Sequence, residues 1–200
     1  PLRHPQNTAW IINTSIAQSK ITHQDDRCAF FAAAASLTLS YLLAGKEKSL
    51  TAIVAYLTEQ LESHFPNLLY FLEAFSKNGT DWDKQYYWLS QLGIEDSTKH
   101  YGYLEDRLKR NPNVHPFFGG YAPVTFLWPL CLVLKYEGKF LPAVYECIST
   151  KGDTDTTCAV LGSLSGAWKM PDDRIMKWVE KIDKARQILD VADALASLQQ

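Results

Sequence analysis

The chain has 200 residues, 46% of them hydrophobic, and a formal net charge of −2 at pH 7. This apolar content is enough for one domain with a substantial core, and we expect residues 1–200 to form a single domain. Lys and Arg are spread along the chain and slightly outnumbered by Asp and Glu, which argues against nucleic-acid binding as a main function.

The sequence contains no stretch of about 18 apolar residues and no amino-terminal pattern of a secretory signal. Its four cysteines are far apart, lack Cys-x-x-Cys spacing and lie in apolar surroundings typical of buried, reduced thiols. These features predict a protein of a reducing compartment, and we expect a cytoplasmic location without membrane contact.

Helical spacing and capping residues dominate the first third of the chain. A first helix is expected to begin after Asn7 or Thr8, and a second, capped by Asp25 or Asp26, to end at Gly45. Alanines 32 to 35 of the second helix would let another backbone approach closely, so we expect this helix to be central. The expected helices are Trp10–Ala17, Arg27–Leu43 and, after a cap at Ser49, Leu50–His64.

The remainder also reads as helical, although residues 79–116 are rich in loop-forming residues. We find no convincing alternating strand pattern, and the predicted class is therefore all-α. The expected helices are Leu68–Phe75, Lys84–Leu92, Tyr103–Arg110, Tyr121–Lys135, Phe140–Cys147, Cys158–Trp168 and Arg174–Leu198.

The stretch from Lys151 to Thr157 reads Lys-Gly-Asp-Thr-Asp-Thr-Thr and precedes a helix rich in small residues. Asp153, Asp155 and Thr156 would place two carboxylates and a hydroxyl within one turn, the donor set preferred by Mg²⁺ or Mn²⁺. The alternative is that Asp153 or Asp155 only caps the helix by accepting hydrogen bonds from its free N–H groups.

Two upstream segments also combine polar residues with a helix start. Thr22 and His23 precede the alanine-rich helix, and Gly119-Gly120-Tyr121 precedes an apolar one. Each has an ordinary explanation: a capping or surface histidine, a turn that needs glycine, and a tyrosine that packs at a helix start.

Together, Thr22-His23-Gln24-Asp25, Gly120-Tyr121 and Gly152-Asp153-Thr154-Asp155-Thr156 resemble motifs of the ADP-ribosylglycohydrolase family, the enzymes related to dinitrogenase-reductase-activating glycohydrolase. The three segments occur in the family's order. The resemblance implies an orthogonal multi-helix bundle. It also implies Mg²⁺-dependent (or Mn²⁺-dependent) hydrolysis of the glycosidic bond that links ADP-ribose to a protein side chain or a related acceptor.

The resemblance also implies roles for individual residues. Asp153 and Asp155 would be catalytic, and with Thr156 they would be metal ligands. The expected partner is an ADP-ribosylated protein or a small molecule that contains ADP-ribose. The implied ligand-binding residues are Thr22, His23, Gly119, Gly120 and Tyr121.

The sequence departs from the family pattern in three places. Lys151 stands where the family usually has the first of two glycines, and the segment Gly166–Pro171 is shorter than the family's loop. The family's amino-terminal helices, with their Thr-Asp-Asp and glycine-rich phosphate motifs, have no counterpart here. We therefore expect a chain truncated at its amino end, whose missing site residues come from a further segment or a second chain.

These departures keep two functions open. One is a hydrolase with part of its active site outside this sequence. The other is a non-catalytic, degenerate relative that acts as an ADP-ribose-binding or protein-interaction module. Either one predicts that Arg27–Leu43 packs its alanine face against the glycine face of Cys158–Trp168, with His23 and Asp153 at the same end of the bundle.

Overall fold

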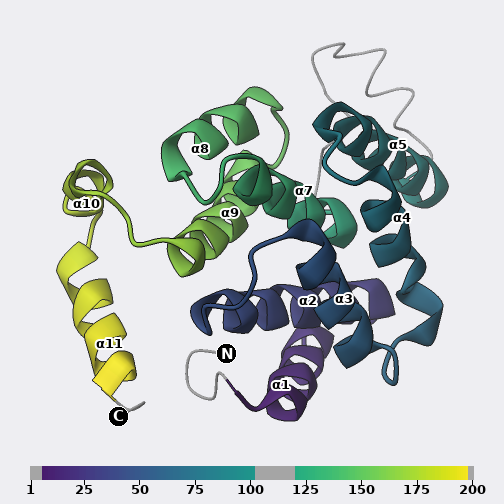
Figure 1. Ribbon diagram of the computed structural model, residues 1–200, viewed down its shortest axis with the longest axis horizontal. Helices are drawn as coiled ribbons and strands as arrows, with labels where there is room; N and C mark the ends of the chain where they lie inside the picture. The colour runs from purple at the N-terminus through teal and green to yellow at the C-terminus, as the bar shows by residue number, and fades with distance from the viewer. Residues whose placement is uncertain (1–5, 102–119, 198–200) are drawn as a thin grey trace.

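A computed structural model of the chain describes residues 6–101 and 120–197, with side chains for residues 6–93 and 120–197. Within these ranges it contains ten α-helices, one short 3₁₀ helix and no strand, which confirms the all-α class (Figure 1). The elements in chain order are α1 (Thr8–Lys20), α2 (Asp26–Leu43), α3 (Leu50–Leu61), η1 (Pro66–Leu68), α4 (Tyr70–Asn78), α5 (Trp82–Tyr101), α7 (Ala122–Lys135), α8 (Phe140–Ser149), α9 (Thr154–Trp168), α10 (Asp173–Val179) and α11 (Ala185–Ser197).

The first three helices begin at the predicted caps. Side-chain oxygens of Asn7, Asp25 and Ser49 accept hydrogen bonds from backbone N–H groups one turn into α1, α2 and α3. Each bond satisfies a donor that has no partner inside the helix. Gly45, directly after the C-cap of α2, has a positive φ of 67°, the conformation expected of a residue that ends a helix there.

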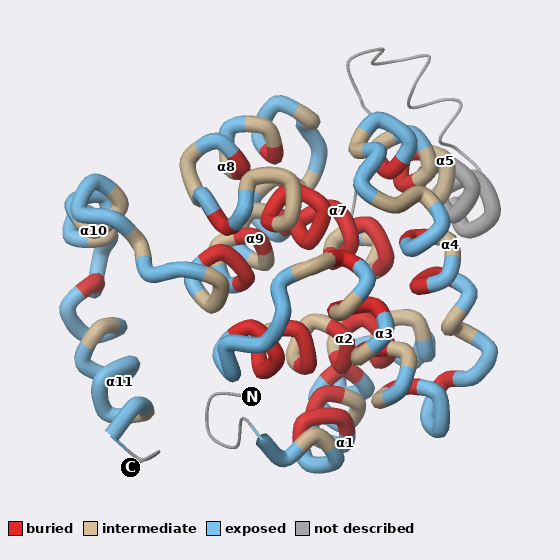
Figure 2. Tube along the Cα trace, in the orientation of Figure 1, coloured by how far each residue is buried: buried red, intermediate tan, exposed pale blue. Residues whose placement is uncertain are grey.

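Helix α2 lies at the centre of the molecule, as its alanine content predicts. Ala29, Ala33 and Ala34 have no exposed surface, and α2 contacts α1, α3, α7 and α9. Small side chains allow four neighbours to approach one helix without leaving voids. Figure 2 shows the buried residues concentrated in α2, α7 and the helices around them.

Helix α7 is the second central element and contacts α2, α5, α8 and α9. Its segment from Phe126 to Val133 is buried throughout, so neighbours surround the helix on every side. The two central helices thereby connect the amino-terminal helices to the α8–α9 pair, which carries the Lys151–Thr157 stretch.

Helix α5 is longer than predicted, reaching from Trp82 to Tyr101 instead of Lys84–Leu92. Its start is fixed by Asp81, which accepts a hydrogen bond from the N–H of Lys84, and by the buried amide of Gln85, which donates to Phe75 O and Gly79 O. Beyond Leu92 the sequence has no apolar periodicity, which is why the continuation could not be seen. The predicted helix Tyr103–Arg110 lies outside the described residues.

The expectation of a single helix over Arg174–Leu198 is wrong. The chain forms α10 and α11, separated by a turn in which Lys184 has a positive φ of 60°. Apolar residues of these helices, including Ile188 and Val191, are more than half exposed, so their helical spacing does not mark a core-facing side. Figure 1 shows α10 and α11 set apart from the other helices. Among the described residues, no helix combines the length and apolar character needed to cross a membrane.

Candidate functional site

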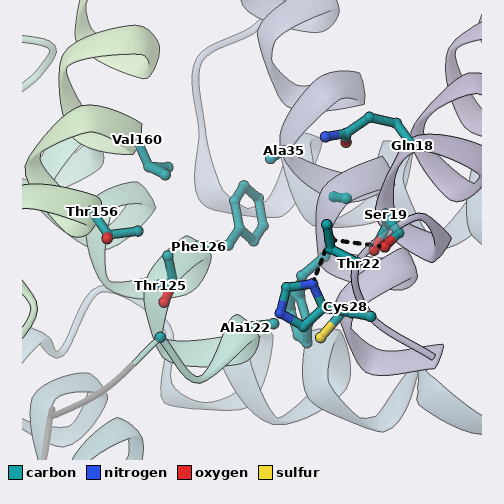
Figure 3. Close-up of a pocket in the computed structure, with 14 residues that line it drawn as sticks. Gln18, Ser19, Thr22, Cys28, Ala35, Ala122, Thr125, Phe126, Thr156 and Val160 are labelled. Atoms are coloured by element: carbon teal, nitrogen blue, oxygen red, sulfur yellow. Dashed lines mark hydrogen bonds between the residues drawn. The ribbon is translucent and has the colours of Figure 1, made fainter. Parts of the chain in front are cut away.

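An open cavity of about 320 Å³ lies where the end of α1, the start of α2, the start of α7 and the start of α9 meet (Figure 3). Its apolar lining includes Phe31, Phe126 and Val160. Its polar lining comes from three segments that are distant in the sequence, and consists of Gln18, Ser19, Thr22, His23, Thr125 and Thr156. The cavity therefore brings residues of the Thr-His stretch and of the Asp-Thr-Asp-Thr stretch to one place.

Helices α2 and α9 are in contact, as predicted. The prediction that the glycines of α9 form this contact is wrong. A Cβ on Gly162 would lie 3.6 Å from a ring carbon of Phe140 in α8, and a Cβ on Gly166 would have no heavy atom within 4 Å. The small-residue face of α9 is thus turned partly towards α8 and partly towards open space. Ala32 and Ala35 of α2 line the cavity itself.

Thr22 and His23 lie in the connection between α1 and α2, and both line the cavity. The Thr22 hydroxyl oxygen is 2.8 Å from Nδ1 of His23 and 3.4 Å from the carbonyl oxygen of Ser19. The first contact holds the imidazole through Nδ1, and the second ties the Thr22 hydroxyl to the end of α1. Both side chains are exposed, so their remaining polar groups are accessible from the cavity.

Asp153 is the N-cap of α9, so the capping interpretation holds for this residue. Its Oδ1 accepts a hydrogen bond of 3.4 Å from the Thr156 N–H, and its carbonyl oxygen accepts one of 2.8 Å from the Thr157 hydroxyl. The other carboxylate oxygen, Oδ2, faces Gly120: a Cβ on that glycine would be 3.6 Å away. Capping uses one oxygen and leaves the second directed at a residue of the cavity wall.

Asp155 is exposed in the first turn of α9, next to Asp153. A side-chain hydrogen bond with Asp153, followed by backbone N–H groups of the same turn, lowers the pKa of Asp155 below its usual value. At neutral pH Asp155 is therefore ionised. The two aspartates and Thr156 thus lie at the start of α9, and of the three only Thr156 is among the residues that line the cavity.

Lys151, which stands where the resemblance would place the first of two glycines, has an unfavourable backbone conformation. Lys151 has a φ of 62° and Gly152 has a φ of 86°. Both residues are in the left-handed region, which residues with a Cβ rarely adopt. For a residue with a Cβ, this conformation costs about 1–2 kcal/mol. The turn thus keeps a backbone suited to two glycines although its first residue is lysine.

The remaining predicted ligand residues, Gly119, Gly120 and Tyr121, have different outcomes. Gly120 lines the cavity, whereas Tyr121 is not among its lining residues. The Tyr121 hydroxyl accepts a hydrogen bond of 3.4 Å from Arg27, whose guanidinium lies 5.4 Å from the ring centroid. Arg27 is also paired with Asp25, the acidic residue of the Thr-His-x-Asp stretch. Tyr121 therefore packs at the helix start, and Gly119 lies outside the described residues.

The sequence reasoning did not select Gln18, Ser19 or Thr125 as cavity residues. Thr125 could have been selected from the sequence, because it is a hydroxyl residue in the first turns of an otherwise apolar helix. Gln18 and Ser19 carried none, because the last turn of a surface helix is polar in most proteins. Their position became visible only when α1 was placed against α2.

The model of a protein family described as ADP-ribosylglycohydrolase matches residues 1–200, the whole chain. The chain belongs to the ADP-ribosylglycohydrolase family. No curated protein and no solved structure gives a significant match to it. The family consists of hydrolases that act on ADP-ribosylated substrates and are typically metal-dependent.

The donors present in this family member fit a divalent cation only in part. Asp153, Asp155 and Thr156 supply hard oxygens of the right chemistry, and their charges favour a cation. Within residues 6–93 and 120–197, however, no group of three or more His, Cys, Asp or Glu side chains is placed to hold a metal. These three residues therefore offer one side of a coordination shell.

Proposed function

We propose that this family member binds Mg²⁺ through Asp153, Asp155 and Thr156, binds an ADP-ribosyl group in the adjoining cavity, and takes part in hydrolysis of the glycosidic bond to a protein side chain or related acceptor. The supporting observation is that one open cavity is lined by Thr22, His23, Gly120 and Thr156. Its volume of about 320 Å³ is at the lower end of small-molecule sites, roughly 300–1,000 Å³.

Each motif contributes a different property to the proposed site. Asp153 and Asp155 provide negative charge, and Oδ2 of Asp153 faces Gly120, which has no side chain. When bound, the ion would supply a Lewis acid that neutralises charge on the substrate. His23, oriented by Thr22, provides a ring nitrogen for hydrogen bonds to a hydroxyl or phosphate oxygen.

In the proposed hydrolysis, the oxygen of a water molecule attacks the anomeric carbon of the ribose. An ionised carboxylate of the Asp153–Asp155 pair accepts a proton from this water. The bond between that carbon and the nitrogen or oxygen of the acceptor breaks. The acceptor takes up the proton that the carboxylate removed from water, which restores the ionised carboxylate. Asp155, whose pKa is lowered below its usual value, is ionised at neutral pH and therefore carries the negative charge that favours a cation.

Binding is tested by thermal unfolding of the wild type with Mg²⁺, with ADP-ribose and with both. A ligand at 100 times its dissociation constant stabilises the folded state by about 2.7 kcal/mol. Asp153→Asn and Asp155→Asn should lose the Mg²⁺-dependent shift. Asparagine preserves the N-cap of α9, so a loss of shift at Asp153 would report on charge and not on helix stability.

Asp172→Asn is the matched control, because Asp172 caps α10 through an equivalent hydrogen bond of 3.0 Å to the Ile175 N–H. This variant should keep the full Mg²⁺ shift. A wild type that shows no shift with either ligand would overturn the binding proposal. Release of ADP-ribose from Arg-linked and Ser-linked peptides, with and without EDTA, then tests hydrolysis separately.

The second candidate is a non-catalytic ADP-ribose-binding or protein-interaction module. The partial donor set favours it, as does Lys151 beside the two carboxylates. Among the described residues, however, no ion pair joins Lys151 to Asp153 or Asp155.

ADP-ribose binding without Mg²⁺-dependent turnover would support the second candidate. The decisive complement is to add a polypeptide that carries the family's Thr-Asp-Asp segment and repeat the hydrolysis assay. Turnover that appears only in the mixture would assign the missing ligands to that second segment and return the chain to the catalytic proposal.

A further inference from the structure

Arg27, the second residue of α2, contacts two segments that are distant in the sequence. Its Nε lies 3.0 and 3.1 Å from the two carboxylate oxygens of Asp25, and its Nη2 lies 2.5 Å from Oδ2 of the same residue. Nη1 donates to the Tyr121 hydroxyl at 3.4 Å, and the guanidinium lies 5.4 Å from the centroid of the Tyr121 ring. One rigid, planar group therefore joins the segment before α2 to the start of α7.

Arg27 and Tyr121 are not among the residues that line the cavity, whereas residues adjacent to both of them are. Cys28 follows Arg27 in the chain, and Gly120 and Ala122 flank Tyr121; all three line the cavity. A shift of the backbone at either end of the link would therefore displace part of the cavity wall.

Asp25 connects Arg27 to the Thr22–His23 connection. It is the N-cap of α2, where its Oδ1 also accepts a hydrogen bond of 2.8 Å from the Arg27 N–H. Asp25 is only two residues beyond His23, so few rotatable backbone bonds separate the ion pair from the imidazole. The Arg27 side chain is 26% exposed, so solvent screens this pair less than a fully exposed one.

We infer that Arg27 is a positioning residue that fixes the Thr22–His23 connection relative to the Gly120 turn and so sets the shape of the cavity. The inference rests on the proposed function where it concerns ADP-ribose. A ligand that enters a cavity whose walls are already in place loses less free energy to ordering them, so the link should increase affinity. The positioning itself does not depend on that function.

Hydrogen exchange without any ligand tests the positioning itself. Arg27→Gln removes both contacts and keeps a residue that favours helix formation. Amide exchange, measured by mass spectrometry, should rise about threefold or more in peptides that cover residues 22–28 and also in peptides that cover residues 120–125. Tyr121→Phe removes only the hydroxyl acceptor and should raise exchange in both segments to a smaller extent, which tests the inference even where Arg27→Gln fails to fold.

Lys135→Gln is the matched control, because it breaks a similarly exposed ion pair with Glu146 at the other end of α7. It should leave exchange in both segments unchanged. A rise confined to residues 22–28 in Arg27→Gln would show that the guanidinium stabilises only the start of α2, and would overturn the inference.

Titration calorimetry with ADP-ribose tests the consequence for binding. Arg27→Gln should weaken binding about tenfold and Tyr121→Phe about threefold. The double variant should bind like Arg27→Gln, because the Tyr121 hydroxyl acts only through the guanidinium. Further weakening in the double variant would mean that Tyr121 touches the ligand directly, and would contradict the positioning role.

Arg27→Lys keeps the positive charge but loses the fork that spans both partners, and it should bind ADP-ribose more weakly than the wild type. Wild-type affinity in this variant would show that charge alone matters, which would also contradict the positioning role. A wild type that does not bind ADP-ribose would overturn the proposed function, and hydrogen exchange would then decide the inference by itself.

Discussion

Gly120 and Asp153 face each other across the edge of the cavity, since a Cβ on Gly120 would stand 3.6 Å from Oδ2 of Asp153. The two residues lie on different elements, one before α7 and the other before α9. That distance is an ordinary contact, so the pair leaves room for little more than a methyl group. A side chain larger than a methyl group at position 120 would therefore crowd this carboxylate oxygen.

The first prediction concerns Gly120. Gly120→Ala should fold normally and bind Mg²⁺ nearly as well as the wild type, whereas Gly120→Val should cover Oδ2 and weaken Mg²⁺ binding about tenfold, equivalent to about 1.4 kcal/mol. Titration calorimetry with Mg²⁺ measures both, and urea unfolding checks that the variants remain folded. Equal Mg²⁺ affinity in the wild type and Gly120→Val would show that Oδ2 is not a ligand.

The second prediction concerns the strained turn. Lys151→Gly relieves a left-handed conformation that costs about 1–2 kcal/mol, while the added flexibility of the unfolded chain removes about 0.5–1 kcal/mol of that gain. The net expectation is a small increase in stability of about 0.5–1 kcal/mol, measured by urea unfolding. Gly152→Ala, at a φ of 86°, should have the opposite sign.

The third prediction concerns the contact between Gly138 and Trp168, which joins the α7–α8 turn to the end of α9. A Cβ on Gly138 would lie 2.1 Å from Cδ1 of Trp168, so the indole must move. Gly138→Ala should destabilise the protein by about 3 kcal/mol or more, as overpacking adds to the cost of the positive φ. Lys48 lies against the same residue: its Nζ donates to the carbonyl oxygen of Trp168 at 2.6 Å and is 5.4 Å from the centroid of the indole ring.

Gly45→Ala is the matched control for this variant. Gly45 has a φ of 67°, close to the 73° of Gly138, but a Cβ there would have no heavy atom within 4 Å. It should cost only the conformational part, about 1–2 kcal/mol. Similar losses in the two variants, measured by urea unfolding, would contradict the role given to Trp168.

The fourth prediction concerns Glu146, which joins α8 to the end of α7. Its carboxylate accepts hydrogen bonds from Lys135 Nζ at 2.8 and 2.9 Å and from the Tyr136 hydroxyl at 2.5 Å. At pH 8, Glu146→Gln should lose about 1–2 kcal/mol of unfolding free energy, the range for partly buried hydrogen bonds to charged groups.

The pH dependence of this network follows from Tyr136, whose pKa is raised by its hydrogen bond to Glu146. Folding then favours the protonated phenol, so this contribution is complete below the unfolded pKa of about 10 and is lost as pH rises through the higher folded value. Urea unfolding from pH 8 to 11 should show the difference between wild type and Glu146→Gln narrowing above pH 10. If the difference in unfolding free energy between wild type and Glu146→Gln stayed constant over this pH range, the Tyr136 hydroxyl would not contribute to the network.

Local patterns in the sequence predicted the class of the fold and most helix starts. Asn7, Asp25, Ser49 and Asp153 cap their helices through bonds to residues two or three positions away, so neighbouring residues contain all the information needed. The order of the Thr-His, Gly-Tyr and Gly-Asp-Thr-Asp-Thr segments also indicated the family, which the match over residues 1–200 confirms.

Predictions that depended on partners distant in the sequence were less successful. The apolar spacing of residues 174–198 suggested one continuous helix, yet the chain turns at Lys184, and Ile188 and Val191 are more than half exposed. Periodicity shows that a helix has an apolar side but not whether another element covers it. Likewise, the small residues of α9 indicated close packing without identifying Phe140 as a neighbour of Gly162.

The sequence by itself therefore determined the fold class and most helix starts with their caps, and it selected Asp153, Asp155 and Thr156 as candidate metal ligands. The tertiary structure decided that Thr22, His23, Gly120 and Thr156 share one cavity, that Tyr121 turns to Arg27, and that Oδ2 of Asp153 faces Gly120. The reason is physical: capping and helix formation depend on neighbouring residues, whereas a cavity exists only where helices from separate parts of the chain pack together.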